Sequence, residues 1–355
     1  MRQNPRRLSS QRPWYASNEA RLGAVIVALI LLAGGAALMR TNEPIPGAGV
    51  VLVPSVPPID GLATAATSNG SASPSASGAA TETPTPSATP QPLLIDLRPP
   101  TVGQGETMLV WVHAPGAFNV ALDFRGEIYN LVPEGEVFWG VVGAPLDAAL
   151  GADELTVTAT SSSGDLIETQ NAPFEVIHVE RPVDYITLTD EVASVLTPEA
   201  AEQERQLRER IFTEFDRGRR WSTYFRFPTE GPMSSEFGQG RSYNGGPVGG
   251  FHTGTDIAAP EGTPILAAGP ARVDWVGEMP VRGISVVLDH GAGVKTGYHH
   301  LSAAFVAVDE IVEAGQLIGE VGSTGLSTGP HLHWELTVWG VNVSPVSWTL
   351  KDFTP

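Results

Sequence analysis

Six of the eight histidines in this 355-residue chain lie between His252 and His333, close to its carboxyl end. The last two, His331 and His333, alternate with apolar residues in the run His-Leu-His-Trp-Glu-Leu-Thr-Val, which predicts a β-strand with one polar and one apolar face. Side chains two positions apart on a strand share a face, so both imidazoles should point the same way. They could supply a metal ligand and a neighbouring acid or base. Taken alone, the run fits a solvent-exposed polar face equally well.

The stretch from His252 to Asp256 offers a second pair of ligating side chains. A histidine and an aspartate four residues apart, with a glycine between them, can bend around one cation and offer it a nitrogen and an oxygen. With His333 they make three ligands, and a catalytic zinc site takes three protein ligands and leaves a fourth position for water. The chain has no cysteine, so any metal must be bound through His, Asp or Glu.

Two adjacent histidines, His299 and His300, follow Tyr298. If these residues end a strand, Tyr298 and His300 share a face and His299 points away from it. We therefore expect His299 at the surface, and His300 beside the metal together with His331. Hydrolysis needs such imidazoles, one to take a proton from the attacking water and another to stabilise charge that develops on the attacked carbonyl.

Three further features lie near these histidines. Glu335 shares the predicted face of His333, as either a partner that orients the site or a surface carboxylate. Asp289 and His290 are expected in a solvated turn. Residues 323–329 are rich in Gly and Ser but lack the Lys of a phosphate-binding loop, so we interpret them as the wall of a groove.

The segments His252-Thr253-Gly254-Thr255-Asp256, Tyr298-His299-His300 and His331-Leu332-His333 resemble, in the same order, the three motifs of the M23 family of zinc metallopeptidases. That family includes lysostaphin-like peptidoglycan endopeptidases. The resemblance covers residues 228–345 and says nothing about residues 1–227.

The resemblance implies a compact antiparallel β-sheet domain with its site in a groove on the sheet. It implies one Zn2+ ion per chain, held by three ligands: His252, Asp256 and His333. It also implies that His300 and His331 form the catalytic pair, with His331 as the general base. Tyr298, in the second motif, is a candidate substrate-binding residue.

The amino-terminal region carries a different signal. Residues 22–39 are an uninterrupted apolar run, about long enough to cross a bilayer as a helix. Five arginines and one acidic residue precede it, so the positive-inside rule predicts that residues 1–21 are a cytoplasmic basic leader. The protein would then be a single-pass protein of the cell membrane with its carboxyl-terminal domains outside the cytoplasm. The alternative is a cleaved signal peptide and a secreted protein.

The predicted architecture between the anchor and the carboxyl end is mainly β. Residues 40–92 form a Ser/Thr/Pro/Ala-rich linker that we expect to be disordered. Residues 93–180 alternate in short runs typical of a small Ig-like β-sandwich, which we interpret as a spacer without a site. Residues 181–227 form a connector with a helix over 197–219 that packs on a neighbouring domain. Residues 228–355 form the peptidase-like domain.

The net charge of −18 argues against nucleic acid as a partner, because binding to phosphates needs a basic surface. The sequence predicts an exported, membrane-anchored zinc metalloendopeptidase that hydrolyses peptide bonds of bacterial peptidoglycan during cell-wall remodelling. One alternative is a non-catalytic relative that binds or regulates cell-wall hydrolases. Another is a structural or adhesive surface protein.

Overall fold

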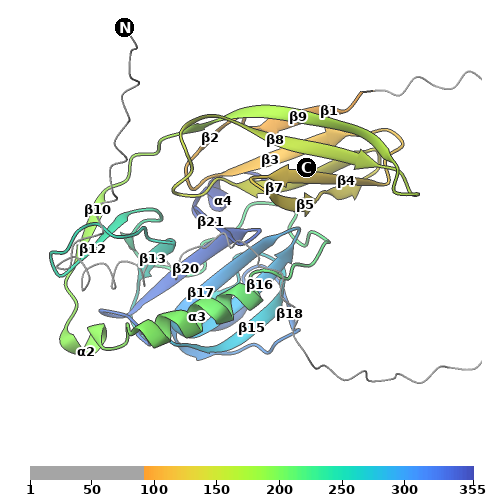
Figure 1. Cartoon of the computed structure of the whole chain (residues 1–355). Helices are drawn as coiled ribbons and strands as arrows, with labels where there is room; N and C mark the ends of the chain where they lie inside the picture. Colours follow the sequence, from red (N-terminus) through yellow and green to blue (C-terminus); the bar gives the residue numbers. More distant parts are fainter. Residues whose placement is uncertain (1–91) are drawn as a thin grey trace, which may run out of the picture. The chain divides into compact units, whose positions relative to one another are not determined.

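The computed structural model describes residues 92–355, and β-strands are its main secondary structure (Figure 1). The predicted leader, the membrane helix at 22–39 and nearly all of the linker lie outside the described residues. Among residues 92–355, no helix is both long enough and apolar enough to cross a membrane.

Two sheets form a sandwich at the start of this region. One sheet has the strand order β1 (Leu94–Arg98), β3 (Thr107–His113), β7 (Val137–Gly143), β6 (Val132–Glu134). The other has the order β2 (Thr101–Gly103), β9 (Leu166–Ile177), β8 (Gly151–Thr160), β4 (Asn119–Phe124), β5 (Glu127–Asn130). The alternating apolar residues of β8 and β4, such as Val157 and Leu122, are fully buried in the core between the sheets.

The connector contains β10 (Val183–Ile186), α2 (Asp190–Ala193) and α3 (Pro198–Ile211). Thr197 caps α3 by accepting a hydrogen bond from the Ala200 backbone, as its residue type predicts. The helix is shorter than predicted, because tertiary contacts replace helical ones after its end. The Asp216 backbone N–H, for example, donates to the Asp289 carboxylate at 3.0 Å.

A large antiparallel sheet follows. Its main strand order is β11 (Met233–Ser235), β13 (Gly254–Ala258), β20 (His331–Val338), β17 (Val294–Ala304), β16 (Gly283–Gly291), β15 (Ala271–Met279), β18 (Ile311–Val312). Attached to it are β14 (Pro264–Leu266), β19 (Leu317–Val321) and β21 (Val341–Val343). The remaining elements are β12 (Gly240–Tyr243), which pairs in parallel with β10, and α4 (Ser347–Leu350).

Strand β20 is buried on both faces, whereas its alternating sequence predicted one polar, half-exposed face. Leu332 and Trp334 lie in the apolar core on one side of the sheet. Glu335 and Thr337 point the other way and are also fully buried. Helix α3 lies across this second face (Figure 1), so the polar side chains meet the helix instead of water.

The segment after α3 also buries the turn between β16 and β17, so the prediction that Asp289 and His290 are solvated is wrong. Both residues are fully buried. The Arg220 backbone N–H donates to the His290 carbonyl at 2.9 Å. The His290 ring bonds the Pro270 carbonyl and the Thr296 hydroxyl, each at 2.8 Å. Protein groups therefore take the place of water as hydrogen-bond partners of Asp289 and His290.

Candidate metal centre and active site

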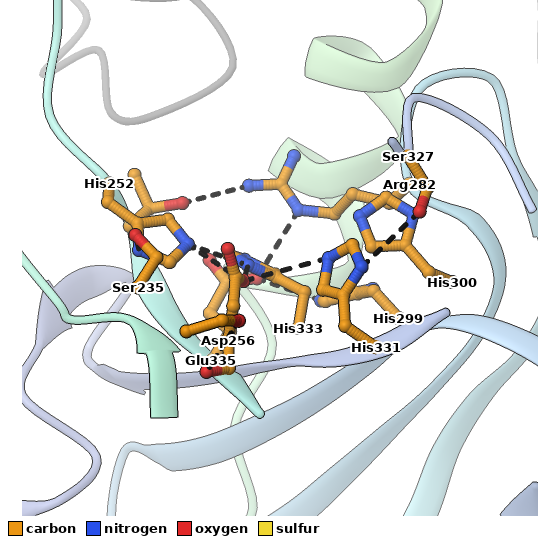
Figure 2. A network of polar contacts seen from close by, with 12 residues as sticks. Ser235, His252, Asp256, Arg282, His299, His300, Ser327, His331, His333 and Glu335 are labelled. Atoms are coloured by element: carbon orange, nitrogen blue, oxygen red, sulfur yellow. Dashed lines mark hydrogen bonds and ion pairs between the residues drawn. The ribbon is translucent and has the colours of Figure 1, made fainter. Parts of the chain in front are cut away.

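Three candidate metal ligands converge at one end of β13 and β20 (Figure 2). The two strands are antiparallel neighbours, and their register places Asp256 directly opposite His333. His252 lies two residues before β13. His252 Nε2 lies 3.0 Å from both Asp256 Oδ1 and His333 Nδ1, and the last two atoms are 2.8 Å apart. The structure thus brings together the three residues chosen from sequence.

The spacing of these three atoms suits a tetrahedral metal ion. Ligands about 2.0 to 2.2 Å from zinc in a tetrahedron lie about 3.3 to 3.6 Å from one another. The observed separations of 2.8–3.0 Å need only a small opening to reach that range. Two imidazole nitrogens and one carboxylate oxygen are donors that zinc accepts, and they leave a fourth position open.

Neighbouring groups orient the ligands for this task. His252 Nδ1 lies 2.9 Å from the Glu236 carbonyl, so it carries the proton and leaves the Nε2 lone pair for a metal. Arg241 donates to the second oxygen of Asp256 at 3.3 Å, and Asp184 on β10 holds Arg241 at 2.8 Å. Burial is the main cause that lowers the pKa of His333 to about 3, so its imidazole is neutral near pH 7.

The two candidate catalytic histidines stand beside the ligands, with ring centres 4.8 Å apart. His331 Nδ1 donates to the Gly329 carbonyl at 2.8 Å, which leaves a lone pair on Nε2, 3.8 Å from Asp256 Oδ1. His300 Nδ1 donates to the Thr324 carbonyl at 2.7 Å. Burial, followed by the effect of His331, lowers the pKa of His300 to about 3. Nε2 is therefore the nitrogen of each ring that no backbone carbonyl engages.

The strand that carries His300 does not alternate as predicted, because it contains a β-bulge. Tyr298 pairs with Val286 and Leu301 pairs with Ile284, so two residues of β17 oppose one residue of β16. His300 takes up the extra position in the left-handed region, with φ of +62°. The bulge turns the His300 side chain toward the site. Regular alternation would instead point it to the same side as Tyr298, into the apolar core.

The predictions for the other two residues of this motif are wrong. His299 is fully buried rather than exposed, and its ring bonds Glu335 at 3.0 Å and Ser285 at 2.9 Å. Tyr298 is fully buried in the apolar core, where its hydroxyl accepts a hydrogen bond from the Ala268 backbone at 2.9 Å. Tyr298 is therefore not placed to contact a substrate.

Glu335, for which the sequence left two roles open, is not a surface carboxylate. It is fully buried and accepts hydrogen bonds from Arg208 on α3, from His299 and from Asn342. Burial by itself would raise the pKa of Glu335, but Arg208 and Arg282 hold that pKa well below its usual range. An ionised carboxylate thus lies beneath the site.

A pocket of about 170 Å³ opens over the candidate centre. His252, Asp256, His300, His331 and His333 all line it. The predicted groove wall contributes residues 326–328. The rest of the lining combines polar groups, Arg241 and Arg282 among them, with apolar side chains, three of which belong to the connector: Ile186, Leu188 and Leu196.

Sequence reasoning missed the charged residues that support this pocket, namely Asp184, Glu204, Arg208, Arg241 and Arg282. One signal was present for two of them. Glu204 and Arg208 are four residues apart, and Leu207 and Ile211 mark the buried stripe of the same helix. Charged residues bordering such a stripe are expected to meet partners on the surface against which the helix packs.

Comparisons with known proteins agree with this geometry. Residues 250–345 match Peptidase family M23. The chain is 48% identical over 97 residues to DD-carboxypeptidase/endopeptidase Mpg of Neisseria meningitidis, which covers 27% of this chain and 22% of that protein. It is 46% identical over 89 residues to peptidoglycan DD-endopeptidase ShyA of Vibrio cholerae, covering 25% of this chain and 21% of that one. The matches thus span about a fifth of these relatives.

The fold has a counterpart among solved structures. A protein from Pseudomonas aeruginosa described as a peptidase M23 superimposes with a TM-score of 0.50 at 25% sequence identity. The superposition covers 69% of this chain and 94% of that one. It therefore extends well beyond the 96 residues of the family match at 250–345.

Proposed function

We propose that the protein is a zinc metalloendopeptidase that hydrolyses peptide bonds of bacterial peptidoglycan. The match of residues 250–345 to peptidase family M23 supports this proposal. One observation carries the proposal. Three ligating atoms 2.8–3.0 Å apart lie in a pocket that two further imidazoles also line. The names of the similar endopeptidases support peptidoglycan as the substrate.

The proposed roles follow from which atoms face the pocket. His252, Asp256 and His333 would hold the zinc ion. When bound, zinc supplies a Lewis acid that polarises the scissile carbonyl and acidifies water. His331 Nε2 has a free lone pair beside these ligands, so it accepts the proton of the attacking water.

His300 has the complementary role of stabilising negative charge on the attacked carbonyl oxygen. Its Nδ1 proton is already donated to the Thr324 carbonyl. The ring must therefore carry a second proton, on Nε2, in the reactive complex before it can donate to that oxygen. Negative charge that develops nearby favours this protonation.

We also propose the membrane topology predicted from residues 1–39, with the amino terminus in the cytoplasm and the carboxyl-terminal domains outside. The proposal rests on the apolar run and on the arginines before it. A reporter enzyme that works only after export, fused behind Pro355, should be active. An active cytoplasmic reporter at the same position would contradict this topology.

The peptidase proposal is tested with the purified full-length chain, loaded with zinc and incubated with purified peptidoglycan. Mass spectrometry of the products should reveal fragments with a new amino group and a new carboxyl group at a peptide bond. The matched control is His331→Ala, which should keep its zinc and release little product. If the zinc-loaded wild type binds peptidoglycan without cleaving it, the protein is a non-catalytic binder instead.

A further inference from the structure

Glu204 on α3 is a fully buried carboxylate outside the family match at 250–345. All of its hydrogen bonds go to one short loop between β15 and β16. Glu204 Oε2 accepts from the backbone N–H groups of Val281 and Arg282, at 2.6 and 2.9 Å. Glu204 Oε1 accepts from the Arg282 guanidinium at 2.5 Å. A glutamate is almost never fully buried unless it is paired, and each of its bonds here fixes the same two residues.

The same loop holds the backbone of His300. The Arg282 carbonyl accepts a hydrogen bond from the His300 N–H at 2.9 Å. This contact lies at the bulge, where His300 has a positive φ that side-chain-bearing residues rarely adopt. Such a conformation costs roughly 1 to 3 kcal/mol and persists only when the surroundings fix it. The position of the Arg282 carbonyl is therefore one of the constraints on His300.

The loop also holds the segment that orients the His300 ring. The Thr324 carbonyl accepts the Nδ1 proton of that ring at 2.7 Å. Two residues further on, the Leu326 N–H donates to the Val281 carbonyl at 2.7 Å. Glu204 thus fixes two residues whose carbonyls anchor both the backbone of His300 and the segment that its ring contacts.

We propose that Glu204 is a positioning residue for His300, so that the connector helix α3 is a working part of the active site. The inference rests on the proposed peptidase function and deepens it. Glu204 touches none of the proposed ligands and does not line the pocket itself, and it acts through Val281 and Arg282, which do line it. A peptidase fragment that starts after α3 would therefore lack a component of its own site.

The test uses three variants of the full-length chain. Glu204→Ala removes every contact with the loop, whereas Glu204→Gln keeps the size of the side chain and loses the charge that pairs with Arg282. Glu209→Ala is the matched control, because Glu209 lies on the same helix and pairs only with Arg205 near the surface. Bound zinc, the unfolding midpoint, kcat and KM are measured for each.

We expect Glu204→Ala to keep one zinc ion and to lose about 10- to 100-fold in kcat with little change in KM, because misplacing a catalytic group by about 1 Å costs this much. Glu204→Gln should show a smaller loss of kcat. This variant tests the proposal if the alanine variant does not fold. Glu209→Ala should match the wild type. Turnover of a folded Glu204 variant within about twofold of the wild type would overturn the proposal.

A double-mutant cycle with His300→Ala separates positioning from a general structural role. If Glu204 acts through His300, adding Glu204→Ala to His300→Ala should cause almost no further loss of kcat. Losses that multiply would show that Glu204 acts elsewhere, and the proposal would be wrong.

Amide hydrogen exchange tests the same contact without relying on turnover. Glu204→Ala should accelerate exchange at the His300 and Leu326 amides, while Glu209→Ala should leave both rates unchanged. Unchanged protection in Glu204→Ala contradicts the proposal even if the wild type hydrolyses peptidoglycan. If exchange is faster in Glu204→Ala but the wild type does not hydrolyse peptidoglycan, only the proposed function is overturned.

Discussion

Two regions build the candidate site, and they do so in different ways. Strands β13, β17 and β20 carry Asp256, His333 and both catalytic histidines, and the third proposed ligand, His252, lies two residues before β13. The connector carries none of these groups; it contributes apolar side chains to the pocket and supports the site through ion pairs, such as Asp184 with Arg241 and Glu204 with Arg282. Groups on one strand keep a fixed spacing, whereas an ion pair requires only that two segments meet in the fold. A sequence motif therefore identifies the ligands and catalytic residues but not the ion pairs that hold them in place.

The difference predicts graded effects of substitution. Changes on the strands remove a ligand or a proton acceptor and should nearly abolish turnover. Changes in the connector leave these groups present and loosen them. If substitutions in the connector reduced turnover more than substitutions on the strands, this distinction between the two regions would be wrong.

Among substitutions that leave the metal ligands intact, the largest effect is expected from His331→Ala. His331 is the proposed proton acceptor and not a metal ligand. The variant should therefore keep one zinc ion per chain and lose about 100- to 10,000-fold in turnover. Zinc analysis and the rate of peptidoglycan cleavage are measured on the same sample. His178→Ala, on the sandwich, is the control and should match the wild type. Loss of zinc from His331→Ala would mean that His331 is a ligand.

The next effect concerns pH and stability, and it tests how firmly the connector's end covers the sheet. Burial lowers the pKa of His290 to about 4, whereas an unfolded histidine titrates near 6.5. Between these values the unfolded chain binds the extra proton, so this contribution to stability is lost as the pH falls from about 6.5 to 4. The loss approaches about 3 kcal/mol over that range, or 1.4 per pH unit.

Urea unfolding of wild type and His290→Asn at several pH values checks this prediction. The dependence of the unfolding free energy on pH should be weaker in the variant over that range. Equal slopes for the two proteins would mean that His290 is solvated, as its sequence context suggested.

A smaller effect is expected from His299→Ala. The substitution leaves the buried Glu335 and Ser285 each without one hydrogen-bond partner. Stability should fall by about 1 to 3 kcal/mol, measured by urea unfolding of the zinc-loaded protein. A change below about 0.5 kcal/mol would instead fit an exposed histidine.

The shared face of His331 and His333 was predictable because side chains two positions apart on a strand point the same way. The sequence failed at His299, because that residue lies on the sheet face that α3 covers, and at the orientation of His300, because no local pattern announces the bulge. It failed at Asp289 and His290 for another reason, since their burial depends on a segment seventy residues earlier in the chain. The β-rich class was predictable from alternation, whereas the covering of β20 by α3 required the tertiary structure.

The smallest effect is expected from Asp184→Asn in the connector. Arg241 would keep its contact with Asp256 but lose its own anchor, so zinc affinity should fall by about tenfold. Competition with a coloured chelator measures this affinity. Glu191→Ala, an exposed change in the same connector, is the control. An unchanged affinity in Asp184→Asn would show that β10 does not support the metal ligands.

The proposed peptidase activity depends most directly on a metal ion bound by His252, Asp256 and His333. The decisive measurement is the zinc content of the purified full-length wild type and of His333→Ala, taken together with peptidoglycan cleavage. We expect one zinc ion per wild-type chain. The variant should lose both zinc and cleavage, since two protein ligands hold a catalytic zinc poorly. A His333→Ala protein that retains a full equivalent of zinc, or that still cleaves peptidoglycan, would contradict the proposal.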